Sequence, residues 1–254
     1  MPQTLLTTSE VFAKTWHEGK THLGADLKDS MWFLGIALAS FVLALAGFYL
    51  PSIPRFALHI FDLVVLQIIG NTWITLKLSA RVLAEQQEKK FQPVKVTMLG
   101  SYLLIGILSG LATVGGTLAF VLPGIWLTIA FAFAIYAFLD ENRRGRQALA
   151  RSAELVKGRW WSVLARLIFP GFVILVVSML AGSIIESLVG LIAGYRPSML
   201  ITDTTNLSWL TIGPPSVNIA SAALGVINTL PLVIAIPFLT HLTVTIYLDL
   251  KRTR

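Results

Sequence analysis

The feature that most constrains this chain is a long stretch without any charged residue, from Lys95 to Asp140. Pro123 and Gly124 lie near its middle. Proline lacks a backbone N–H and glycine tolerates a left-handed backbone, so this pair can end one helix and begin another. One bilayer crossing needs about 20 apolar residues, and the stretch is long enough for two. It predicts a transmembrane hairpin whose turn, Pro123-Gly124, lies at the far membrane face.

The composition supports a membrane fold throughout the chain. Hydrophobic residues make up 55% of the 254 residues and charged residues 13%, whereas soluble domains carry roughly 25% charged residues. Backbone polar groups have no water partner in hydrocarbon, so spanning segments must be helices or a closed barrel. The apolar runs do not alternate with polar residues, which favours helices. We therefore predict an all-α polytopic membrane protein with about six transmembrane helices and short interfacial amphipathic helices.

Three segments are expected along the chain. Residues 1–30 form a cytoplasmic interfacial N-terminal segment, with a helix within 8–28 that is capped by Thr8 or Ser9 and lies on the bilayer. Residues 31–250 form a single six-helix transmembrane domain, and 251–254 form a basic cytoplasmic tail. The expected spans are residues 31–50, 55–80 (continuing as a helix to 88), 96–120, 125–139, 161–193 and 217–248, with one long outer loop at 195–215.

The distribution of basic residues predicts the orientation. Cytoplasmic loops collect Lys and Arg. With the N-terminus inside, every Lys and Arg except Arg55 and Arg196 falls on the inner side. Both termini are therefore expected in the cytoplasm. Aromatic residues at the two membrane faces would then be Trp32, Trp160 and Trp161 inside, and Trp126 and Trp209 outside.

The net charge of +7 and the absence of cysteine exclude several functions. In a soluble chain this charge would suggest nucleic acid, but here membrane topology accounts for it, and no nucleic-acid partner is expected. Without cysteine there is no thiolate metal site and no Cys nucleophile. His17 and His22 are five residues apart, so they point about 140° apart on a helix and do not match the zinc-binding HExxH pattern. The sequence predicts no metal site and no cofactor.

A basic stretch follows Asp140. Residues 147–156 read as a short amphipathic helix, with Gly158 as its stop. Basic side chains near a membrane surface attract anionic lipid by about 1 kcal/mol each. An ordinary basic loop that only determines topology is the alternative. The predicted lipid-headgroup residues are Arg143, Arg144, Arg146, Arg151, Lys157 and Arg159.

A second candidate set consists of polar residues inside the spans. Such residues are costly in lipid and are often functional. The alternatives are a local ion pair that hides its own charges in the second span and, for His241, a histidine that merely packs between helices. The set comprises Arg55, His59, Asp62, Gln67, Asn71, Glu186 and His241.

The middle of the chain resembles a known family. The resemblance rests on three features: the Leu-Pro-Gly-Ile-Trp-Leu turn at 122–127, the acidic span end Asp140-Glu141, and the pattern Ala-Leu-x-Arg-Ser-x-Glu-Leu-x-Lys-Gly-x-Trp at 148–160. They resemble the membrane domain of some bacterial glycerophosphoryl diester phosphodiesterases and related stand-alone six-span bacterial proteins. The likeness is sharpest over residues 118–165. It implies a bacterial inner-membrane protein connected with lipids. The catalytic barrel of the phosphodiesterases has no counterpart in this chain, so no catalytic residues are carried over.

No enzyme signature is present, and we do not expect an enzyme. The leading hypothesis is an integral membrane protein that binds or organises lipid, or is the membrane subunit of an assembly. Its partners would be anionic membrane lipids, together with a second protein or a second copy of the chain. The alternative hypothesis is a small transporter or channel that uses the polar residues of the second, fifth and sixth spans.

Overall fold

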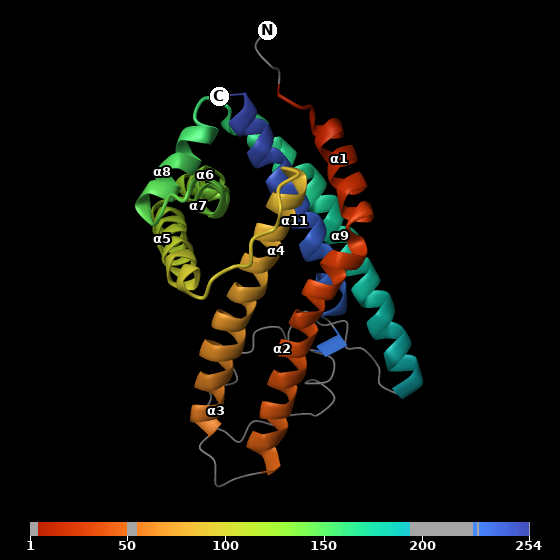
Figure 1. The fold of residues 1–254 in the computed structure, drawn as a ribbon. Coiled ribbons are helices and arrows are strands. Elements are labelled where there is room, and N and C mark those ends of the chain that lie inside the picture. Colours follow the sequence, from red (N-terminus) through yellow and green to blue (C-terminus); the bar gives the residue numbers. More distant parts are fainter. Residues whose placement is uncertain (1–4, 50–54, 194–225, 228, 254) are drawn as a thin grey trace.

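The chain folds into helices connected by short loops (Figure 1), as seen in a computed structural model that describes residues 5–49, 55–193, 226–227 and 229–253. The predicted outer loop at 195–215, with Trp209, lies outside the described residues. The main elements are α1 (Thr8–Thr21), α2 (Leu23–Tyr49), α3 (Arg55–Phe61), the π-helix η1 (Asp62–Gly70), α4 (Asn71–Gln86), α5 (Thr97–Ala119), α6 (Val121–Phe131), α7 (Ala134–Glu141), α8 (Arg146–Val156), α9 (Trp160–Ala193) and α11 (Leu230–Arg252).

Six helical segments are long and apolar enough to cross a membrane, which confirms the predicted all-α polytopic fold. The chain is a multi-pass integral membrane protein. In the most apolar stretch of α11, 67% of the residues are buried, whereas in that of the segment formed by α3, η1 and α4 only 6% are buried. Helix α11 is therefore enclosed by the other helices, and the side chains of α3 and η1 lie at the protein surface.

The two ends of the chain meet at one end of the molecule, which we call the terminal end (Figure 1). The backbone N–H of Leu6 donates to Asp249 Oδ2 over 3.1 Å. Arg159, before α9, donates to the hydroxyl and the carbonyl of Thr253. The ends of α1, α9 and α11 are thus joined at a single point.

The N-terminal segment differs from the predicted helix at 8–28. Helix α1 ends at Thr21, and α2 begins at Leu23, because His22 breaks the helix. Thr7, and not Thr8 or Ser9, is the N-cap, in a capping box with Glu10. One face of α1 is buried, and α1 packs along α9 and α11. The helix therefore belongs to the protein core on that side.

The second segment is a continuous helix from Arg55 to Gln86, close to the predicted 55–88. Its middle, η1, is a π-helix, a form that often marks functional sites. Neither α3 nor η1 contains a buried residue among the side chains described, whereas α4 buries Ile74, Leu76, Leu78 and Val82.

The hairpin predicted from Pro123 and Gly124 is present, but its turn lies elsewhere. The chain reverses at Phe120, whose backbone is extended, and Pro123 and Gly124 lie in the first turn of α6. Proline is tolerated there because the first N–H groups of a helix have no partner within it. A Cβ on Gly124 would lie 2.8 Å from the Cα of Thr117. Gly124 therefore permits the close approach of α5 and α6.

The sequence predicts the tip of this hairpin at the membrane face opposite the start of α9. In the structure the tip lies beside the start of α9 instead. The indole N–H of Trp160 donates to the carbonyl of Trp126 over 3.4 Å, so these two residues cannot lie at opposite membrane faces. At the other end of the same segment, Asp140 pairs with Lys251 at the terminal end. Consistently, Figure 1 shows α6 and α7 nearly end-on while α2 and α4 are seen lengthwise. The segment thus crosses the long helices at a steep angle.

Candidate functional site: a polar seam along α2 and α4

Polar side chains lie in two groups along the contact between α2 and the long helix α3–η1–α4, and we call this line the polar seam. The terminal group contains Asp26, Asp29, Lys77, Arg81 and Glu85, and is joined by His241 of α11. The distal group contains Ser40, Asp62, Gln67 and Asn71. Charged or amide groups inside a membrane protein are costly to bury, so their alignment along one helix pair marks a candidate functional site.

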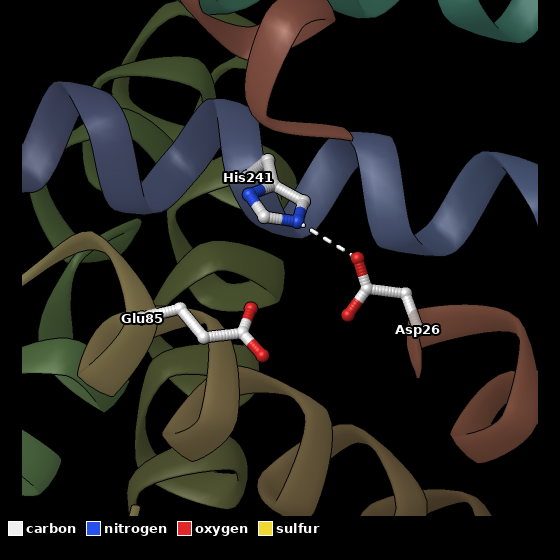
Figure 2. A group of neighbouring side chains, drawn as sticks. All are labelled: Asp26, Glu85 and His241. Atoms are coloured by element: carbon white, nitrogen blue, oxygen red, sulfur yellow. Dashed lines mark hydrogen bonds and ion pairs between the residues drawn. The ribbon is translucent and has the colours of Figure 1, made fainter. Parts of the chain in front are cut away.

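The centre of the terminal group is formed by Asp26, Glu85 and His241, which come from α2, α4 and α11 (Figure 2). Their nearest ligand atoms all lie within 4.8 Å of one another. His241 Nε2 lies 2.9 Å from Asp26 Oδ2, and both side chains are fully buried. Figure 2 shows the Glu85 carboxylate turned toward the same space as the other two groups.

Gln86 and Thr245 lie beside the ring of His241. The amide nitrogen of Gln86 lies 3.3 Å from His241 Nδ1 and 3.3 Å from the carbonyl oxygen of His241. With Nδ1 as the acceptor of this amide, Nε2 carries a proton and donates it to Asp26. The Gln86 amide is oriented in turn by Thr245, whose hydroxyl donates to Gln86 Oε1 over 3.1 Å.

Two carboxylate oxygens of this cluster accept no hydrogen bond. Asp26 Oδ1 and Glu85 Oε2 are buried atoms without a hydrogen-bond partner among the described residues. A buried oxygen of this kind costs free energy unless something binds it. The cluster is accessible on one side, since the side chains of Glu85 and His22 are 21% and 34% exposed. His22 Nδ1 lies 3.7 Å from Glu85 Oε2, and its ring is stacked on that of His241.

The remaining members of the terminal group balance part of its charge. Asp29 pairs with Lys77 over 2.9 Å and with Arg81 over 2.7 Å. Arg81 also lies 3.9 Å from Glu85. Three carboxylates therefore face two permanently charged side chains together with the imidazoles of His22 and His241. In this group the carboxylates outnumber the lysine and arginine side chains.

The distal group is a chain of hydrogen bonds between α2 and η1. The hydroxyl of Ser40 donates to Asp62, Gln67 Nε2 donates to Ser40 over 3.0 Å, and Asn71 Nδ2 donates to Gln67 over 3.1 Å. The structure thus brings together three of the predicted intramembrane residues, Asp62, Gln67 and Asn71. The sequence did not single out Ser40, which links them.

Apolar side chains separate the two polar groups. On α4, Asn71, Ile74, Leu78, Arg81 and Glu85 recur at three and four residues, so they share one face of the helix. Ile74 and Leu78 are buried between the polar members of this face. The seam is therefore polar at both ends and closed by apolar side chains in between.

Other predicted intramembrane residues lie apart from the seam or cannot be placed. His59 is exposed, and no ion pair joins it to Asp62 among the described contacts. The side chains of Arg55 and Glu186 lie outside the described residues. His241 was interpreted chiefly as a packing histidine, and it lies at the centre of the buried cluster.

The predicted lipid-headgroup residues divide into two groups. Arg151 binds Glu141 and Glu154, and its hydrogen bond to Glu141 raises the pKa of its guanidinium above the ordinary value. Arg159 is bound to Thr253. These two arginines thus make contacts within the protein, and lipid binding by them stays a prediction. The remaining side chains of the set are exposed: Arg143, Arg144, Arg146 and Lys157.

Sequence reasoning missed Asp26, Asp29 and Glu85. A signal was available, because Lys77, Arg81 and Glu85 recur every four residues and thus form a charged stripe at one end of the second span. Asp26 and Asp29 lie just before the expected first span, a region interpreted as surface. Their connection to His241, more than 200 residues away, depends on the tertiary fold.

Comparisons with models of protein families, with curated proteins and with solved structures found no match to this chain. The resemblance to the phosphodiesterase membrane domain therefore stays a prediction, and the argument for function rests on the geometry of the seam.

Proposed function

We propose that this membrane protein is a small cation transporter whose ion moves along the polar seam. The observation that carries this proposal is that two polar groups, one of them with the buried carboxylates of Asp26 and Asp29, lie on the same helix pair. Asp62 and Glu85 are 23 positions apart, which corresponds to about 35 Å of helix at 1.5 Å per residue. The hydrocarbon core of a bilayer is about 30 Å thick. The seam is therefore long enough to reach from one side of the membrane to the other.

The apolar side chains of Ile74 and Leu78 support a transporter more than an open pore. A path that is polar at both ends and closed in the middle admits an ion to each end without a continuous leak. The π-helix η1 lies directly beside this closed part. Its backbone departs from regular α-helical hydrogen bonding, so a change of its register could move Gln67 and Asn71 relative to α2.

The proposal is tested by flux in liposomes that contain the purified protein. Ion-sensitive dyes inside the vesicles would report the entry of protons, monovalent cations and divalent cations separately. We expect flux of one cation class, at least about tenfold slower in Asp26→Asn and Asp62→Asn, on the scale of losing one favourable ion contact. Glu88→Gln is the matched control, because Glu88 is exposed and outside the seam. Flux equal to that of empty vesicles, or unchanged in both seam variants, would reject the transporter.

Lipid binding is the second candidate, and it is favoured by a separate observation. A shallow apolar groove lies between the hairpin tip and the start of α9, lined by Leu122, Pro123, Trp126, Leu127, Trp160 and Trp161. Exposed basic side chains are carried by the same part of the fold, on either side of α8. A groove for an acyl chain together with cationic residues for the headgroup matches an anionic lipid.

Mass spectrometry of lipids that co-purify in mild detergent distinguishes the two candidates. If lipid binding is the function, the triple variant Arg143→Gln, Arg144→Gln, Arg146→Gln should lose the bound anionic lipid. Lys14→Gln, an exposed change on α1, should retain it. Equal lipid content in the two proteins would count against specific binding by the arginines.

A further inference from the structure

We infer that Asp26, Glu85 and His241 form a binding site for a first-row divalent transition metal such as Zn²⁺. The three side chains come from three different helices, and their ligand atoms lie within 4.8 Å of one another. As an assignment of the transported ion, this inference rests on the proposed function. As a binding site, it can be measured without any flux.

The ligand set indicates the class of metal. Imidazole nitrogen together with two carboxylates suits zinc and its neighbours. Calcium and magnesium prefer oxygen ligands alone, so His241 argues against them. Three protein ligands leave at least one coordination position open, which is typical of sites that exchange their metal or bind a further ligand.

The unpartnered oxygen is an independent sign of a ligand. Asp26 Oδ1 is buried without a hydrogen bond, whereas buried polar atoms in folded proteins are almost always satisfied. A metal bound to Asp26 Oδ1 would give this oxygen the partner that it lacks. The same metal on His241 Nε2 would replace the proton on that nitrogen, which lies 2.9 Å from the other oxygen of the same carboxylate.

The charge around the site fits a cation. Asp29 is paired to Lys77 and Arg81, and Arg81 also lies 3.9 Å from Glu85. The buried carboxylate of Asp26 is therefore the one that faces no lysine or arginine among the described ion pairs. Glu85 is partly exposed and gives the ion a way in from solvent. His22, beside Glu85, offers a second imidazole near the same entry.

A second shell is already present around His241. A metal on Nε2 would transfer the ring proton to Nδ1, which would then need an acceptor. Rotation of the Gln86 amide by half a turn would present its oxygen to Nδ1 and its nitrogen to the hydroxyl of Thr245. The rotation would give up the hydrogen bond that the amide nitrogen now donates to the carbonyl of His241. Gln86 is therefore the side chain placed to hold the ring of a metal-bound His241.

The site is tested by titrating the purified, chelator-treated full-length protein in detergent with Zn²⁺ in a calorimeter. We expect one Zn²⁺ per chain, and a Co²⁺ complex with a visible absorption band typical of nitrogen and oxygen ligands. Asp26→Asn and His241→Gln should abolish binding. Gln86→Leu should weaken it about 10- to 100-fold, as is usual for a second-shell partner. The matched controls, Glu88→Gln and His17→Gln, change exposed residues and should bind as the native protein does.

Folding is controlled separately, because Asp26 and His241 are buried. Glu85→Gln changes a partly exposed ligand, so it should fold normally, shown by native elution and circular dichroism, and still lose Zn²⁺ affinity. Absence of binding by the native protein would overturn the metal site, as would unchanged affinity in Glu85→Gln. Metal binding without flux would reject the transporter while leaving the site in place. Flux of another cation without metal binding would reject the metal site while leaving the transporter in place.

Discussion

Two regions of this protein pack in opposite ways. The terminal bundle comprises α1, α4, α7, α8 and α11, and it contains most of the buried residues. The distal arm comprises residues 31–49 of α2 with α3 and η1, and none of its described side chains is buried. Apolar residues in the bundle contact protein, whereas those of the arm face outward, where lipid is their natural contact.

The ionic residues follow the same division. The buried ion pair Arg166–Asp249 and the buried contact between Asp26 and His241 lie toward the terminal end. The distal arm has Asp62, which accepts a hydrogen bond from the uncharged Ser40. The comparison teaches that this chain concentrates its polar chemistry where protein surrounds it, and the predictions below test that contrast.

The largest effect is expected from breaking the buried pair Arg166–Asp249. Both side chains are at most 5% exposed. Arg166→Met would leave Asp249 buried without its main cation, which typically costs about 3–5 kcal/mol. Unfolding by denaturant in detergent micelles measures this loss. Arg144→Met, at an exposed position with no ion pair to the described residues, should stay within about 0.5 kcal/mol of the native protein.

A matched leucine pair on one continuous helix tests the division directly. Leu78 is 0% exposed and lies in the bundle, whereas Leu63 is 53% exposed and lies in the arm. Leu78→Ala should cost about 2–5 kcal/mol, because it leaves a cavity. Leu63→Ala should change the free energy of unfolding by about 0.5 kcal/mol or less. Equal losses in the same unfolding assay would show that the arm is packed by protein.

A glycine pair tests the hairpin. A Cβ at Gly124 would meet the backbone of Thr117, while a Cβ at Gly110 has nothing within 4 Å. Gly124→Ala should destabilise the protein by about 1–3 kcal/mol through overpacking. Gly110→Ala should leave stability unchanged or raise it by up to about 1 kcal/mol, because alanine favours helix. If both variants unfold alike, α5 and α6 do not make this close contact.

The smallest effect concerns the cap of α1. Hydrogen bonds from the backbone and then the side chain of Thr7 hold the pKa of the Glu10 carboxyl below its ordinary value of 4.5. A carboxyl with a lowered pKa contributes stability above the unfolded-state pKa, and the contribution is lost as the pH falls through the folded-state pKa. Glu10→Gln should therefore lower the melting temperature slightly at pH 7, and the difference should disappear in acid below pH 4.5. Glu88→Gln, which changes an exposed carboxyl outside the N-terminal cap of α1, should show no such pH dependence.

Much of the architecture was predictable from local patterns. The predicted starts of the second and fifth spans, at Arg55 and near Trp160, agree with the observed helices. They agree because the ends of an apolar run can be read directly from the sequence. The turn of the hairpin was placed three residues late, because Pro-Gly also fits a first helical turn. Asp62, Gln67 and Asn71 were found because polar residues stand out in an apolar span.

The sequence by itself determined that the chain folds in lipid, which segments are helices, and approximately where those helices end. It could do so because hydropathy and helix breakers act between near neighbours along the chain. The tertiary structure decided which charges meet. Asp26, Glu85 and His241 stand at the surface ends or in the middle of separate helices, and no spacing along the chain relates them. Their distances depend on how α2, α4 and α11 pack, and that packing is also what places the hairpin tip beside Trp160.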